Sequence, residues 1–141
     1  MKTKSLNKLF GLAAILLMAF AFMAFIIPQD QKKAAPWEIP SKYAKMENPY
    51  AGDADVTKVG KMLYSKHCKS CHGSKGLGDG PKAKQLETFP GDFSSEEFQA
   101  GTDGELFYKS IVGRDEMPNY EKKITDDEDQ WAIINFLRTL K

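Results

Sequence analysis

Five consecutive residues constrain this chain more than any other part of it: Cys68-Lys69-Ser70-Cys71-His72. They include both cysteines of the protein and one of its two histidines. Two thiols separated by two residues on a helical turn can reach one edge of a planar ring, and the next residue can supply an imidazole to a metal at its centre. This C-x-x-C-H pattern is the attachment signature of c-type haem. The same residues also fit a redox-active cysteine pair or half of a zinc site, so the rest of the sequence has to decide.

The N-terminal segment predicts export. Three lysines precede an uncharged apolar stretch from Leu9 to Ile27, which is long enough for a transmembrane helix and longer than the apolar part of most signal peptides. Residues 1–27 are therefore expected to be an uncleaved membrane anchor, with a cleaved signal as the alternative. The basic flank places the rest of the chain across the membrane. In that oxidising compartment a free cysteine pair would tend to form a disulfide, whereas attachment to haem explains two separate thiols.

The rest of the chain divides into a linker and one domain. Residues 28–55 contain four prolines and no helical or strand period, so we expect an extended segment. Its aromatic residues are too apolar for a free tether, and part of it is expected to pack on the domain or on a partner. Residues 56–141 have the length and composition of a single small domain.

This domain is predicted to be all-α. Asp55 is a plausible cap for a helix that runs into the cysteine motif, and the glycine-rich loop from Gly73 to Pro81 ends that helix. Three later segments open with a capping-box pattern, and no alternating strand pattern occurs; the segments are Ser94–Glu97, Thr102–Glu105 and Thr125–Glu128. A core this small gives only marginal stability by itself, so a covalently bound, largely apolar macrocycle would supply much of the interior.

If His72 is the fifth ligand of a haem iron, the sixth ligand must come from the opposite face of the ring. Met117 lies far downstream in an irregular stretch and is followed by Pro118, so its thioether is the best candidate. The alternative is a methionine that merely fills the core. Met62 lies on the same helix as the motif, and His67 adjoins Cys68, so neither can reach the other face.

Taken together, these features resemble class I cytochromes c, in particular single-haem bacterial domains. The resemblance covers nearly all of residues 56–141. Gly60-x-x-x-Tyr64 looks like the contact that the first helix makes with an aromatic residue of the last helix, here Phe136. Gly78-Asp79-Gly80-Pro81 resembles the loop whose proline carbonyl accepts a hydrogen bond from the proximal imidazole, which makes Pro81 the expected partner of His72.

The resemblance implies the cytochrome c fold, with helices packed around one covalently bound haem c. It implies that Cys68 and Cys71 hold the haem and that His72 and Met117 are the axial ligands of its iron. The aromatic residues after the loop are expected to form the pocket walls and the core; they are Phe89, Phe93, Phe98, Phe107, Tyr108 and Trp131. Three residues are candidates to bind a haem propionate, and the sequence does not choose among Arg114, Tyr120 and Trp131.

The expected function is one-electron transfer in a respiratory-type chain. A six-coordinate iron leaves no open position for a substrate, so we expect no enzymatic activity. One alternative is a labile Met117 in a protein that binds or reduces a small ligand such as peroxide, CO or NO. The other alternative is a thiol–disulfide protein without haem, which the missing βαβ context disfavours.

The expected partners are redox proteins. Seven lysines and a single acid lie between Lys58 and Lys84, and this lysine-rich lobe could steer acidic partners, although a solvated surface explains it as well. A quinol-oxidising complex, an oxidase or a dehydrogenase fits this description, and no nucleic-acid partner is expected. The expected location is the periplasmic face of the bacterial inner membrane, with a soluble periplasmic protein as the alternative.

Overall fold

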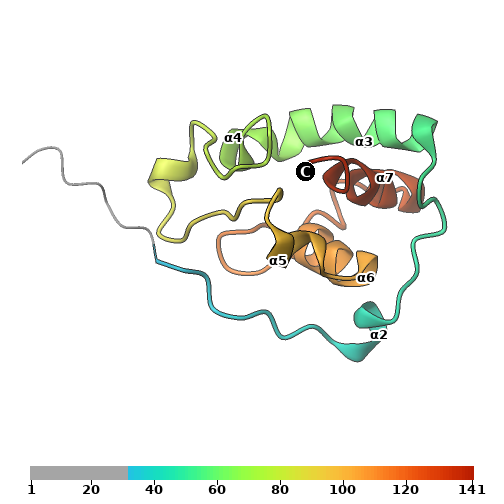
Figure 1. The fold of residues 1–141 in the computed structure, drawn as a ribbon, viewed down its shortest axis with the longest axis horizontal. Helices are drawn as coiled ribbons and strands as arrows, with labels where there is room; N and C mark the ends of the chain where they lie inside the picture. Colours follow the sequence, from blue (N-terminus) through green and yellow to red (C-terminus); the bar gives the residue numbers. More distant parts are fainter. Residues whose placement is uncertain (1–31) are drawn as a thin grey trace, which may run out of the picture. The chain divides into compact units, whose positions relative to one another are not determined.

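The computed structural model describes residues 32–141, which belong to one compact unit (Figure 1). Within this range no β-strand occurs, and the bridges between Lys32 and Thr88 and between Arg114 and Met117 are isolated. The predicted all-α fold is confirmed. Its elements are α2 (Ser41–Ala44), α3 (Ala54–His67), α4 (Lys69–His72), the 3-10 helix η1 (Ala83–Gln85), α5 (Glu96–Gln99), α6 (Asp103–Phe107), the π-helix η2 (Tyr108–Val112) and α7 (Asp127–Leu137).

The predicted anchorage at the periplasmic face of an inner membrane has to be corrected. No helix within residues 32–141 is long and apolar enough to cross a bilayer. The longest of them, α3, has 14 residues and carries several lysines, whereas a spanning helix needs about 20 mostly apolar residues. The segment 1–27, on which the anchor was predicted, lies outside the described residues.

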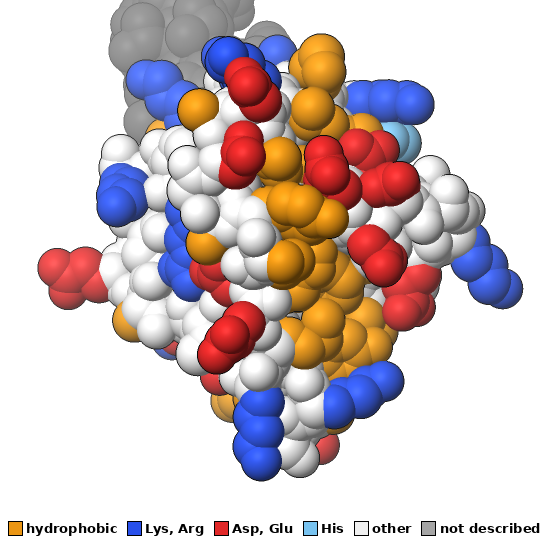
Figure 2. Space-filling model, turned by 90° about the vertical axis from the view of Figure 1, so that its right-hand side faces the viewer, with side chains coloured by type: hydrophobic (Ala, Val, Ile, Leu, Met, Phe, Trp, Pro, Cys, Tyr) orange, Lys and Arg blue, Asp and Glu red, His pale blue; other side chains and the backbone are white. Residues whose placement is uncertain are grey.

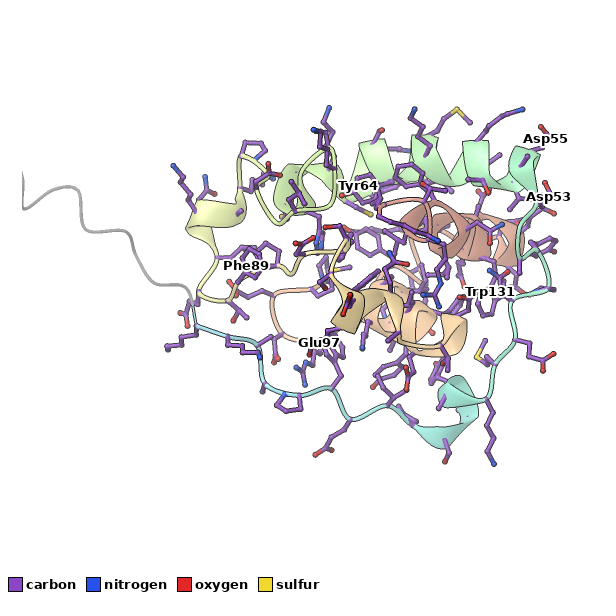
Figure 3. The ribbon with its side chains drawn as sticks, viewed as in Figure 1. Asp53, Asp55, Tyr64, Phe89, Glu97 and Trp131 are labelled. Carbon is purple, nitrogen blue, oxygen red and sulfur yellow. The ribbon has the colours of Figure 1, made fainter. Side chains whose placement is uncertain are left out.

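The centre of the fold is the contact between α3 and α7, which lie side by side in Figure 1. A Cβ atom on Gly60 of α3 would lie 1.8 Å from the carbonyl oxygen of Ala132 in α7, so only glycine permits this approach. One turn further on, the rings of Tyr64 and Phe136 meet with their centroids 5.1 Å apart. The expected contact of the first helix with Phe136 is therefore confirmed, and Figure 3 shows Tyr64 on α3.

Aspartates begin the two long helices. The side chain of Asp53, not Asp55, caps α3 by accepting from the N–H groups of residues 55 and 56. Asp126, not Thr125, caps α7 by accepting from the N–H groups of residues 128 and 129. An aspartate caps a helix as well as threonine does, and its charge also favours the positive end of the helix dipole. The capping-box pattern therefore placed the start of α7 one residue too early.

The capping box predicted at Thr102 and Glu105 is confirmed. The Thr102 hydroxyl accepts from the Glu105 N–H at 3.2 Å, and the Glu105 carboxylate accepts from the Thr102 N–H at 2.9 Å. The helix α6 then widens into η2 and ends at Gly113, whose φ of 68° suits glycine. In α5 the cap is Ser95, one residue after the predicted Ser94.

The segment from residue 32 to residue 50 lies against the helices. Tyr43, Met46 and Tyr50 pack on the buried core. A Cβ atom on Gly104 of α6 would lie 1.9 Å from the carbonyl oxygen of Tyr43, which shows how closely the two backbones approach. Asn135 of α7 donates to the carbonyl of Tyr50 at 2.6 Å. This part of the segment expected to be a linker is therefore joined to the domain by packing and hydrogen bonds.

Three of the six aromatic residues expected in the interior are buried, Phe98 and Tyr108 are partly buried, and Phe89 is exposed. Phe93, Phe107 and Trp131 are buried, together with Leu106, Ile111 and Ile134. Phe89 is 41% exposed, and Figure 3 shows it on the loop beside the start of the described chain. It packs against the backbone at Gly78, where a Cβ atom would lie 2.6 Å from the Phe89 ring.

Candidate haem site

The cysteine motif forms a single turn at the end of α3. The helix ends at His67, and Cys68 serves both as its last cap and as the first cap of α4. The Cys68 N–H donates to the backbone carbonyl of Tyr64 at 2.9 Å, and the His72 N–H donates to the Cys68 carbonyl at 3.0 Å. Both cysteines carry free, partly buried thiols. This turn places two thiols and one imidazole within five residues on a rigid support.

The glycine-rich loop wraps around this turn. Three backbone hydrogen bonds join the N–H groups of Gly78, Gly80 and Lys82 to the carbonyls of His72, Cys71 and Ser70, at 2.9, 3.1 and 2.8 Å. A Cβ atom on Gly80 would lie 2.5 Å from one of those carbonyl oxygens, so the loop needs glycine to come this close. The loop thereby fixes the backbone of the motif from outside.

The side chain of His72 is only 7% exposed. Its ring stacks on Phe93 with centroids 4.5 Å apart and an interplanar angle of 27°. Burial lowers the pKa of His72 to about 4, although a hydrogen bond with the backbone of Pro90 raises it in part. The imidazole is therefore neutral at physiological pH, as a metal ligand must be. Its Nδ1 atom is buried without a hydrogen-bond partner in the described structure.

Pro81 lies on the loop that wraps the motif, between Gly80 and Lys82, and both of these neighbours are hydrogen-bonded to the motif. The backbone group that forms a hydrogen bond with His72, and thereby raises its pKa, belongs to Pro90. No hydrogen bond joins Pro81 to His72 within residues 32–141. The role expected for Pro81 therefore stays a prediction.

Met117 lies on a tight turn that follows η2. Its N–H donates to the Arg114 carbonyl at 2.8 Å, and the Tyr120 N–H donates to the Ile111 carbonyl at 2.8 Å. The side chain is half-buried and packs on the core. It lines one cleft together with Cys68 and His72 of the motif, whereas Cys71 is not among the lining residues. These are Tyr64, Cys68, His72, Phe93, Ser110, Met117, Ile133 and Leu137.

These residues fit a covalently attached haem better than zinc or a redox-active cysteine pair. The cleft combines a thiol, a neutral imidazole with an unpartnered nitrogen and a thioether, within largely apolar walls. Burial raises the pKa of the Cys68 thiol to about 12, and the neighbouring Cys71 adds to this effect, whereas a reactive cysteine pair needs a lowered pKa. No group of three or more acidic, cysteine or histidine side chains in residues 32–141 is arranged to hold a metal ion.

Two of the three candidates for a haem propionate already have protein partners. The Arg114 guanidinium donates to the carbonyls of Ala35 and Pro36. The Tyr120 hydroxyl donates to the His67 carbonyl at 3.0 Å. Trp131 is buried and packs on Phe107, with centroids 4.5 Å apart.

Sequence reasoning did not find two residues of the site. Ser110 lines the cleft from η2, a π-helix, in which side chains take other positions than in an α-helix. The Tyr64 hydroxyl donates to the carbonyl of Gly73 at 2.7 Å, directly after the motif. The spacing of Tyr64 predicted a buried contact, but nothing in the sequence indicated this hydrogen bond.

Comparison with known proteins identifies the family. The family model described as Cytochrome c matches residues 57–141, which is more than half of the chain and includes the motif, the loop and Met117. A search of curated proteins gave no match. The family implies binding of haem c and, in general terms, haem-based electron transfer. The sequence match, the all-helical fold and the cleft agree: this chain belongs to the cytochrome c family.

Proposed function

We propose that this protein is a one-electron carrier of a respiratory-type chain, with one haem c attached to Cys68 and Cys71. His72 and Met117 are the proposed axial ligands, as in class I members of the family. The observation that carries the proposal is that His72 and Met117 line one cleft although they are far apart in the sequence. Bound haem c supplies a redox centre that accepts and releases one electron.

The chain's own residues favour fast electron transfer over catalysis. The stacking on Phe93 and the hydrogen bonds of the glycine-rich loop hold His72 rigidly on its side of the cleft. The turn at Arg114 holds Met117 on its side. Two fixed protein ligands leave no position for a substrate, so the protein is proposed not to be an enzyme. A thioether ligand and apolar walls both favour the reduced state and raise the potential.

Replacement of Met117 tests the ligand set. The ferrous full-length protein is expected to bind CO very slowly, because the thioether holds the sixth position. Met117→Ala should bind CO rapidly and lose the ferric thioether absorption band. Met62→Ala is the matched control, since Met62 is 66% exposed on α3 and its replacement should change neither readout. Rapid CO binding by the unaltered protein would contradict the carrier and favour a ligand-binding cytochrome.

We propose that acidic redox proteins dock on the lysine-rich lobe, residues 58–84; a quinol-oxidising complex, an oxidase or a dehydrogenase would qualify. All seven lysines of the lobe are exposed, and of these seven only Lys58 makes an ion pair with a described residue, Asp55, at 2.8 Å. Leu77, 39% exposed, lies in the loop around the motif. Acidic side chains gather elsewhere: Figure 2 shows them beside an apolar band on the side where α3 begins, and Figure 3 places Asp53 and Asp55 there.

Oxidation by small charged reagents tests this lobe without a partner. The rate with hexacyanoferrate(III), an anion, should fall as salt is added, and the rate with a cationic cobalt(III) chelate should rise. Changing Lys75 and Lys82 to glutamate should lower the hexacyanoferrate rate about tenfold at low salt. The control changes Lys42 and Lys45 to glutamate. Both lie at α2, across the fold from α3 and α4 (Figure 1), so this change should have a much smaller effect. A rate that does not respond to salt would reject electrostatic steering.

A further inference from the structure

The strap, defined here as residues 32–50, passes over the loop that carries Met117. Its first described residue, Lys32, pairs with the segment after η1. The Lys32 N–H donates to the Glu87 carbonyl at 3.1 Å, and the Phe89 N–H donates to the Lys32 carbonyl at 3.2 Å. Its last part packs on α6 and α7. Between these two attachments lies Trp37, which contacts the Met117 loop, defined as residues 113–118.

One side chain of the Met117 loop makes most of this contact. The Arg114 guanidinium donates to the Pro36 carbonyl at 2.8 Å and to the Ala35 carbonyl. Its central carbon also lies 4.1 Å from the centre of the Trp37 ring. Trp37 in turn meets Tyr108 of η2 edge to face, with centroids 6.2 Å apart. The planar, always charged guanidinium is well suited to bind two carbonyls and an aromatic face at once.

The Met117 loop needs this support because its own backbone is strained. Asp115 has a φ of +50°, the only positive φ of a non-glycine residue in the described chain, and such a conformation persists where its surroundings hold it. Glu116 supplies a second attachment, since its carboxylate accepts from the N–H groups of Glu87 and Thr88, each at 3.0 Å. These bonds hold the pKa of Glu116 below its usual range. Met117 follows directly.

We propose that Trp37 and Arg114 form a clamp that keeps the Met117 loop closed and thereby keeps the thioether on the iron. Both are positioning residues, because they act through the loop and not on the iron itself. The inference rests on the proposed role of Met117 as an axial ligand. The clamp gives the strap a function: the strap sets how often the sixth coordination position of the iron opens to outside ligands.

The test measures CO binding to the ferrous, haem-loaded full-length protein. Arg114→Ala and Trp37→Ala each remove the stacking contact, and the first also removes two hydrogen bonds. CO should therefore bind about tenfold faster to each, and the ferric thioether band should weaken. The double variant should bind no faster than Arg114→Ala, since both residues act in one contact. Trp37→Phe keeps an aromatic face and should restore most of the slow binding.

Lys42→Ala is the matched control. It removes another cation–π contact of the strap, in which the Lys42 ammonium lies 4.5 Å from the Tyr43 ring centre, away from the Met117 loop. It should leave CO binding unchanged. Equal acceleration in all variants, including Lys42→Ala, or no acceleration in any, would overturn the clamp. If Met117→Ala binds CO no faster than the unaltered protein, the assignment of Met117 itself fails, and that result is distinct from a failure of the clamp alone.

Discussion

Replacing Gly60 with alanine is expected to destabilise the domain by about 3 kcal/mol, near the upper end for an overpacked core. The added Cβ atom would lie 1.8 Å from the Ala132 carbonyl oxygen and 2.4 Å from its carbonyl carbon. These are backbone atoms, so no change of rotamer relieves the overlap, and α3 and α7 must separate. The intrinsic gain from placing alanine in a helix is smaller, about 1 kcal/mol.

Chemical denaturation of the haem-loaded protein measures this effect. Lys61→Ala is the control, because Lys61 is the next residue of α3 and is exposed; its replacement should change the free energy of unfolding by less than about 0.5 kcal/mol. Because α3 leads directly into the cysteine turn, Gly60→Ala should also reduce the yield of haem-loaded protein. An alanine variant as stable as the unaltered protein would contradict the close packing of the two helices.

Replacing both Cys68 and Cys71 with serine is expected to abolish covalent attachment of haem. A serine hydroxyl has nearly the same size as a thiol, but it does not add to a haem vinyl group to form a thioether. The domain would also lose a covalently held part of its interior, which a core this small can hardly spare. Haem staining after denaturing electrophoresis, which removes haem that is not covalently bound, should give a strong band for the unaltered protein and none for the double variant.

The control for this change is Ser70→Ala, between the two cysteines. The Ser70 hydroxyl lies 3.9 Å from the Cys71 sulfur, so its removal disturbs the same turn without touching the attachment chemistry. This variant should keep its haem stain. Staining of the double serine variant would show that the haem is held by other groups and would contradict the assignment of the motif.

Local sequence signals predicted the helices well. The apolar spacing around Val56, Leu63 and Tyr64 and the capping box at Thr102 describe interactions within a few residues, and the structure confirms both elements. The start of α7 was one residue off because Asp126 competes with Thr125 for the same N–H groups. The motif and the loop after it were specific enough to indicate the family.

Contacts between distant segments could not be predicted. Arg114 and Trp37 are far apart in the sequence, and no spacing rule connects them. The same limit applies to the hydrogen bond between His72 and the backbone of Pro90, while the role expected for Pro81 stays a prediction. The membrane location was predicted from the lysines and the apolar run at the start of the sequence, and the described helices do not support it.

The turn from Cys68 to His72 and the distant Met117 are proposed to hold one haem that carries one electron. A redox titration of the purified full-length protein, followed by visible absorption, tests it most directly. The haem absorbance should interconvert reversibly between two states along a single one-electron curve. Absence of haem absorbance, or a curve with more than one component, would contradict it.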